Sequence, residues 1–225
     1  MAAVHEMVGF SSYPYTNSPL SEFERRARRF SFSFKNGRGC RPLHPTFADV
    51  VRFIAAGVVH CPTFAQPSVL VPIPRSGSSR VPFGRNASTW PASDLADEIA
   101  QHQSRHQNVQ LIKRRMPVQR SSDGPRVSVR EHVMSIAVHA RRELLDARLV
   151  LIDDLLTKGT QAMACVVALR AAGYTGTIEA YFVHQTIAPK PSPLQRQSFL
   201  VHRIRWSEAD LLASRDETGR WRSTL

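Results

Sequence analysis

The sequence predicts an α/β protein with a central, mostly parallel sheet flanked by helices. Two short apolar runs, residues 68–73 and 149–152, lack the alternation of half-exposed strands, which is typical of strands covered on both faces. Segments with helical apolar spacing lie around and between these runs, at residues 46–59, 94–102 and 161–172. Such an alternation of strands and helices favours a parallel sheet with right-handed crossovers.

The N-terminal part of the chain is predicted to contribute one helix and one strand. Residues 1–20 are rich in Ser, Tyr, Pro and Asn, which predicts an irregular lead. Residues 22–29 are predicted to form one short basic helix. The alternation of Phe and Ser over residues 30–35, followed by Asn36-Gly37, predicts a strand that ends in a tight turn.

The middle of the chain carries the first core elements. Thr46 is a suitable N-cap for the helix over residues 46–59. The strand at 68–73 ends in a Pro, Ser and Gly loop at 74–80, and the helix over 94–102 begins with an acidic turn. The remaining elements predicted before residue 149 are a strand at 109–112, a polar stretch at 113–129 and a helix at 130–138.

The C-terminal part repeats the strand and helix pattern once more. The strand at 149–152 leads to the helix over 161–172, which Gly173 is expected to close. A strand is predicted at 177–184. From residue 185 the chain is rich in proline, and one further strand is predicted at 199–206.

Two carboxylates, Asp153 and Asp154, directly follow the apolar run at 149–152. They are expected at the carboxyl end of a parallel strand, which is the sheet edge where ligands bind in open α/β folds. The helix that begins near Thr160 directs its N–H groups and positive dipole end toward the same loop, which favours a bound phosphate. The two acids can accept hydrogen bonds from ribose hydroxyls or help to hold Mg2+. The motif therefore predicts a ribose-phosphate site.

This stretch resembles the phosphoribosyl-pyrophosphate (PRPP) signature of the type I phosphoribosyltransferases, in which a strand, two acids and two apolar residues precede a phosphate turn. The resemblance implies that Asp153 and Asp154 hold the ribose hydroxyls and, through them, Mg2+. It also implies a 5'-phosphate loop formed by Thr157, Lys158, Gly159, Thr160 and Gln161. Thr157 stands where the 6-oxopurine salvage enzymes of the superfamily carry an Asp, and Gln161 replaces a frequent Thr or Ser.

A second loop, after the strand at 68–73, is also suited to an anion. It reads Val-Pro-Ile-Pro-Arg-Ser-Gly-Ser over residues 71–78, so backbone N–H groups and one cation follow a strand end. It resembles the pyrophosphate loop of the family, in the form found in amidophosphoribosyltransferases and in the ComF-like, competence-associated branch. The resemblance implies that pyrophosphate is bound by Arg75, Ser76, Gly77 and Ser78.

The resemblance to the ComF-like branch covers residues 30–185. Phe34-Lys35-Asn36-Gly37 is similar to a Lys-aromatic-x-Gly element of that branch. Residues 83–86 are similar to its Arg-Gly-hydrophobic-Asn element, with Gly84 and Arg85 out of the usual order. The segment at 111–119 is similar to its Arg-rich flexible loop, and residues 130–133 are similar to the helix start that follows this loop. The Cys-rich zinc-binding head of many members is absent from this sequence.

The polar stretch at 113–130 permits three interpretations. It can be an ordinary solvated loop, a mobile lid that closes over PRPP and excludes water, or a contact for the phosphate backbone of nucleic acid. The cations assigned to this flexible loop are Lys113, Arg114, Arg115 and Arg130.

The resemblance implies a single phosphoribosyltransferase-like domain over residues 1–225, with a core at about 46–186 and a small hood from about 20–45 and 187–225. The implied activity is that of a glycosyltransferase of nucleotide metabolism. A nitrogen nucleophile displaces pyrophosphate from PRPP with the help of Mg2+. No general base is apparent, so the acceptor is not identified. The alternative is a PRPP-sensing or nucleic-acid-associated regulatory protein on the same fold.

Composition bears on partners and compartment. The 30 Lys and Arg residues exceed the 18 Asp and Glu residues, for a formal net charge of +12. This positive charge is larger than one anionic ligand requires and is compatible with a nucleic acid partner. The three cysteines form no paired motif and no signal sequence is apparent, so the cytoplasm is expected. No apolar run is long enough to cross a membrane. The sequence is also compatible with a homodimer.

Overall fold

The central sheet has six strands and matches the predicted fold class. In this computed structural model, residues 5–14, 22–39, 46–58, 61–75, 90–118, 127–156, 159–187 and 204–206 are described. The strands of the sheet are β1 (His5–Pro14), β2 (Ser68–Pro72), β3 (His106–Asn108), β6 (Leu149–Leu156), β7 (Ile178–Ile187) and β8 (Ile204–Trp206). Their order across the sheet is β3-β2-β6-β7-β1-β8. All neighbouring pairs are parallel except β1 and β8, which are antiparallel.

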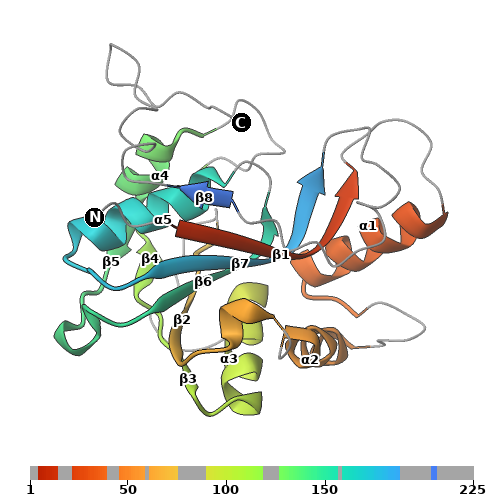
Figure 1. Cartoon of the computed structure of the whole chain (residues 1–225). Helices are drawn as coiled ribbons and strands as arrows, with labels where there is room; N and C mark the ends of the chain where they lie inside the picture. The colour runs from red at the N-terminus through yellow and green to blue at the C-terminus, as the bar shows by residue number, and fades with distance from the viewer. Residues whose placement is uncertain are drawn as a thin grey trace.

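Helices cover both faces of the sheet, as Figure 1 shows. Along β6, Leu149 and Leu151 belong to one buried cluster, and Val150 and Ile152 belong to the other. This alternation is the period of two expected for a strand that is buried on both faces. The helices α4 (Val129–Ser135) and α5 (Thr160–Ala171) pack on the first face, and α1 (Glu22–Lys35), α2 (Phe47–Val58) and α3 (Pro91–His102) pack on the second.

Smaller elements complete the described part. A separate two-stranded antiparallel sheet pairs β4 (Ile112–Arg114) with β5 (Ile136–Val138). Two short 3-10 helices lie at Pro62–Phe64 and Arg142–Leu144. Within the described ranges, no helix combines the length and the hydropathy that a membrane span requires.

Two of the predicted helix boundaries are confirmed by their capping contacts. The Thr46 hydroxyl accepts the N–H of Asp49 at 3.2 Å, and the Asp49 carboxylate accepts the N–H of Thr46 at 3.0 Å, which is a reciprocal cap for α2. At the end of α5, Gly173 has a φ of 95°, and the N–H of Tyr174 donates to Leu169 O at 3.1 Å. A left-handed residue with this bond is a standard helix stop and favours glycine.

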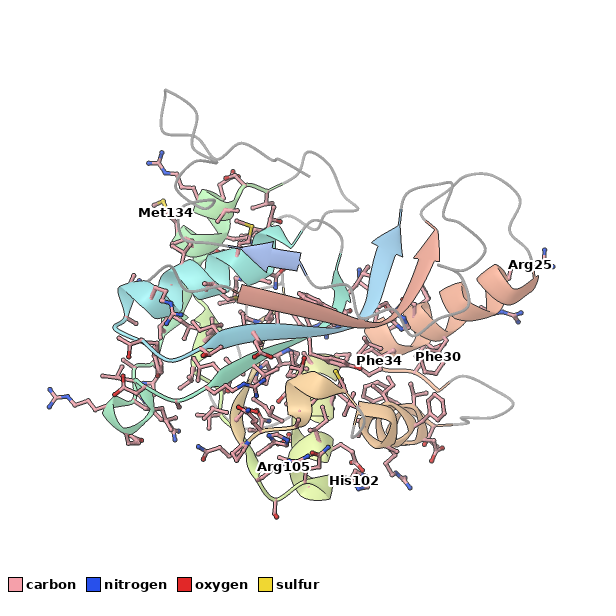
Figure 2. All side chains as sticks on the ribbon, in the orientation of Figure 1. Arg25, Phe30, Phe34, His102, Arg105 and Met134 are labelled. Atoms are coloured by element: carbon pink, nitrogen blue, oxygen red, sulfur yellow. The ribbon has the colours of Figure 1, made fainter. Side chains whose placement is uncertain are left out.

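The predicted strand at residues 30–35 is wrong, because these residues form the last turns of α1. Alternating Phe and Ser is compatible with a strand, but Phe30 and Phe34 are also one helical turn apart. Phe34 is completely buried, whereas Phe32 is 66 % exposed. Phe30 and Phe34 lie on the side of α1 that faces α2 (Figure 2), where Phe30 meets Phe53 at a ring distance of 6.1 Å. Packing against α2 therefore selects the helix.

Other boundaries also differ from the prediction. Residues 5–14 form β1 instead of an irregular lead, because β7 offers them a parallel partner. The predicted strand at 109–112 is replaced by two shorter strands on either side, β3 and β4. The predicted helix over 130–138 ends at Ser135 and continues as β5. Of the predicted strand at 199–206, β8 forms the last three residues, and residues 199–203 lie outside the described ranges.

Candidate functional site

The carboxyl ends of β2 and β6 lie side by side and carry both predicted anion loops. The two strands are parallel neighbours, with Leu70 opposite Val150 and Pro72 opposite Ile152. The N–H of Ile73 donates to Ile152 O at 2.8 Å, so the pairing extends one residue beyond β2. The turn after β2 and the acid pair therefore meet at one edge of the sheet, which is the ligand edge of open α/β folds.

Asp153 and Asp154 lie inside the last part of β6, which extends to Leu156. Because strand side chains alternate, Asp153 shares the face of Leu151 and α5, and Asp154 shares the face of Ile152 and α1. The N–H of Asp154 donates to Asp153 Oδ1 at 2.9 Å, which fixes the first carboxylate against the backbone. At this end of the strand the two carboxyl groups still lie close enough to hydrogen-bond to each other.

Both carboxyl groups are held in an unfavourable environment. Both residues are half-buried, and their carboxyl groups are withdrawn from water. Burial, and then the charge of Asp154, raise the pKa of Asp153 well above its ordinary value of 3.8. Burial also raises the pKa of Asp154, and the Lys35 ammonium is the strongest opposing influence on it. A bound cation would relieve the cost of ionising the pair.

The start of α5 adds a place for an anion. Gly159 is buried, has a φ of 69° and directly precedes the helix. This left-handed conformation favours glycine, which has no Cβ to clash. Because Gly159 has no side chain to cap the helix, the first-turn N–H groups can serve a ligand. Thr160 opens α5, as predicted from the sequence, while Thr157 and Lys158 lie outside the described residues.

Gln161 and Arg114 connect the two loops through one carbonyl group. The Gln161 side-chain amide on α5 donates to Pro74 O, in the turn after β2. Arg114 donates to the same oxygen at 3.4 Å and to Arg75 O at 3.1 Å. The Gln161 amide group is therefore used for a contact between the loops.

Arg114 differs most from its expected place. It lies in β4 rather than in a loop, and its side chain is 1 % exposed. Its guanidinium also donates to the Ser135 hydroxyl and lies 3.4 Å from Nδ1 of His132. Burial lowers the pKa of His132 to about 4, with the Arg114 charge as the next cause. Arg114 is thus part of the packed structure behind the turn.

The other predicted cations have separate positions. Lys113 is half-buried in β4, Arg115 follows the strand and is exposed, and Arg130 is exposed on α4. Arg75 is exposed at the end of the turn, and its charge lowers the pKa of Asp154. The predicted loop residues Ser76, Gly77 and Ser78 lie outside the described ranges.

Two residues near this edge were not assigned from the sequence. Lys35 ends α1, which contacts β6, and its charge lowers the pKa of both acids. The similarity of Phe34-Lys35-Asn36-Gly37 to a family element was a usable signal. Asp94 lies in the first turn of α3, which begins at Pro91 instead of at the predicted residue 94, and its pKa is raised by burial and by Asp97. Among the described residues, Oδ2 of Asp94 is buried and has no hydrogen-bond partner.

The acid pair fits a hard divalent cation such as Mg2+. Mg2+ prefers oxygen ligands and keeps some of its coordination sites for water or for substrate phosphates. In the described part of the chain, no group of three His, Cys, Asp or Glu side chains is placed to hold a metal. Asp153 and Asp154 would therefore hold Mg2+ together with oxygen atoms of a ligand.

Comparisons with known proteins give a weak structural likeness. No family model matches the chain, and no curated protein matches it. Among solved structures, the chain is similar to a purine phosphoribosyltransferase from Pyrococcus horikoshii Ot3, with 14 % sequence identity. The match covers 83 % of this chain and 94 % of that chain, with a TM-score of 0.29. A TM-score this low does not place the two chains in one fold.

Proposed function

We propose that the protein is a PRPP-dependent phosphoribosyltransferase that uses Mg2+, with the ComF-like branch as its nearest family. The observation that carries the proposal is the meeting of three features at one sheet edge. The acid pair lies in the last part of β6, the left-handed Gly159 directly precedes α5, and the turn after β2 contacts both β6 and the first turn of α5. Each feature also belongs to a sequence motif that resembles the family.

Each of the three features would bind a different part of PRPP. The first turn of α5, with Gly159, would receive the 5'-phosphate through backbone N–H groups. Asp153 and Asp154 would accept hydrogen bonds from the ribose hydroxyls. The loop that begins at Arg75 would receive pyrophosphate, aided by the exposed guanidinium. When bound, Mg2+ would neutralise pyrophosphate and help it to leave.

The reaction needs positioning and charge more than covalent chemistry. The bond between C1 of the ribose and the pyrophosphate oxygen breaks, its electron pair leaves with pyrophosphate, and a bond from the nitrogen acceptor to C1 forms. The acceptor nitrogen then loses a proton. Positive charge develops on the ribose ring in the transition state, and the ionised acid pair is suitably placed to stabilise it.

A PRPP-binding regulator would use the same site without turnover. The net charge of +12 is the observation that favours this second function, because it suits a nucleic acid partner. Nucleic acid binding of this kind would weaken steeply as the salt concentration rises.

A pyrophosphate-release assay separates these functions. The protein is incubated with Mg2+, PRPP and a panel of nucleobase and amine acceptors, and PRPP binding is measured in parallel. Release with one acceptor, abolished in the Asp153→Asn, Asp154→Asn double variant and kept in the exposed control Glu143→Gln, supports the enzyme. PRPP binding without release supports the regulator. Absence of PRPP binding rejects both.

A further inference from the structure

We propose that Arg114 and Gln161 form a clamp that fixes the turn after β2 onto the start of α5 and thereby couples the two anion loops. The clamp consists of these two side chains and their shared acceptor, Pro74 O. Both are positioning residues, and their coupling role rests on the proposed function. Neither side chain needs to touch the ligand for the clamp to act.

The geometry links three elements that are distant in sequence. Gln161 belongs to the first turn of α5, Arg114 belongs to β4, and Pro74 follows β2. The Pro74 carbonyl oxygen accepts hydrogen bonds from Gln161 on one side and from Arg114 on the other. The next carbonyl oxygen, that of Arg75, accepts a hydrogen bond from Nε of Arg114 at 3.1 Å. Two successive carbonyl groups of the turn are therefore held toward the protein interior.

This orientation suits an anion. Carbonyl oxygens carry partial negative charge and repel phosphate, so an anion loop must turn them away from its ligand. The clamp occupies the carbonyl oxygens of Pro74 and Arg75, while the Arg75 side chain stays exposed. The turn is thus arranged for an anion before any ligand arrives, which reduces the ordering cost of binding.

Arg114 is buried and hydrogen-bonded behind the clamp. Arg114 is 1 % exposed and also donates to the Ser135 hydroxyl, which in turn donates to His132 O at 2.7 Å. The turn therefore rests on the packed junction of β4 and α4. On the other side, Gln161 belongs to a helix whose buried residues lie in the core.

Coupling follows from this connection. A phosphate at the start of α5 would restrain the first turn of the helix, and Gln161 would transmit that restraint to Pro74. The second anion would then bind to a turn that is already ordered. Coupling between two sites is reciprocal, so each anion should strengthen the other by the same factor.

The test measures this factor by calorimetry with Mg2+ present. Inorganic pyrophosphate is titrated into the protein with and without saturating ribose 5-phosphate. We expect ribose 5-phosphate to tighten pyrophosphate binding about tenfold in the unaltered chain and less than about twofold in Gln161→Met. The matched control is Gln101→Met, at an exposed position of α3, which should keep the full factor. An equal factor in Gln161→Met and in the unaltered chain overturns the proposal.

Amide hydrogen exchange tests the clamp without any ligand. In Gln161→Met, exchange at Ile73 and Arg75 should accelerate at least about threefold, while Gln101→Met leaves it unchanged. Arg114→Lys is a second variant that keeps the charge and loses the fork of donors, so it should accelerate exchange at the same two residues. If the unaltered chain binds neither pyrophosphate nor ribose 5-phosphate, the proposed function fails, and the exchange result alone decides the clamp. Unchanged exchange in Gln161→Met overturns it.

Discussion

Buried charge is paired at the amino end of β6, whereas two like charges lie next to each other at its carboxyl end. At the amino end, Arg148 donates to both carboxylate oxygens of Glu179, at 2.7 and 3.3 Å, to the Ser68 hydroxyl at 2.9 Å and to Thr63 O at 2.8 Å. At the carboxyl end, Asp153 and Asp154 are adjacent acids, each with a raised pKa. The charge of Arg148 is matched by Glu179 and by hydrogen-bond acceptors, whereas the negative charge of the acid pair is only partly compensated by Lys35 and Arg75.

The amino end of β6 therefore stabilises the fold, and the carboxyl end is suited to a ligand. A paired and hydrogen-bonded charge supports the folded state, and removing its partner is costly. Two like charges in a buried position reduce stability unless a cation arrives. Active sites are often places where such a cost is accepted. The strand thus has a structural amino end and a functional carboxyl end.

The largest change in stability is expected at the amino end. Arg148→Met leaves Glu179 without its guanidinium partner, and the two side chains are only 17 % and 15 % exposed. We expect a loss of about 2 kcal/mol, below the full cost for a completely buried pair, and a fall in Tm of about 4–8 °C. Thermal unfolding checks this, with the exposed Arg142→Met as control. A change as small as that of Arg142→Met would refute the structural role of this end.

A smaller change is expected where the carboxyl end meets α5. Gly159→Ala places a Cβ at a φ of 69°, which costs about 1–2 kcal/mol for an ordinary residue. Tm should fall by about 2–8 °C, since each kcal/mol shifts it by about 2–4 °C in a chain of this size. Ala171→Gly, in the last turn of α5, is a useful comparison, because it lowers helix stability without affecting the proposed phosphate position. Only Gly159→Ala should also weaken binding of inorganic phosphate.

The smallest change has the opposite sign and depends on pH. The folded pKa of Asp153 lies above the unfolded value of 3.8, so the folded chain holds a proton that the unfolded chain releases. Stability of the unaltered chain therefore falls as the pH rises from that value through the folded pKa. Asp153→Asn removes this loss and should raise Tm by about 2–4 °C at pH 8 without Mg2+, a gain of about 1 kcal/mol.

Thermal unfolding from pH 4 to 8 in the presence of a chelator measures this difference. The advantage of Asp153→Asn should be smallest at pH 4, grow with pH and become constant above the folded pKa. The exposed Glu143→Gln should show no such trend. An Asp153→Asn variant that is less stable than the unaltered chain at pH 8 would show that the acid pair supports the fold.

The sequence was sufficient for features that depend on neighbours along the chain. The strand at β6, the cap at Thr46 and the helix stop at Gly173 all rest on residues within a few positions of one another. The carboxyl-edge position of Asp153 and Asp154 followed from the same local pattern. Local pattern and tertiary packing agree at these places, which is why the prediction succeeded.

Features that depend on distant partners were missed. Phe30 and Phe34 fit either a strand or a helix, and only the contact with α2 decides between them. His5–Pro14 is a strand because β7 pairs with it, although it is far away in sequence. Arg114 was expected in a flexible loop, but its acceptors are Pro74, Arg75 and Ser135, which are distant in sequence.

We expect the carboxyl end of β6 to bind PRPP with Mg2+, and calorimetric titration of PRPP into the Mg2+-loaded protein measures this binding. Binding should be saturable at one site and weakened on the order of 100-fold or more in the Asp153→Asn, Asp154→Asn double variant. The Arg142→Met control should bind as tightly as the unaltered chain. Absence of PRPP binding by the unaltered chain, or equal binding by the double variant, would show that the acid pair is not a PRPP site.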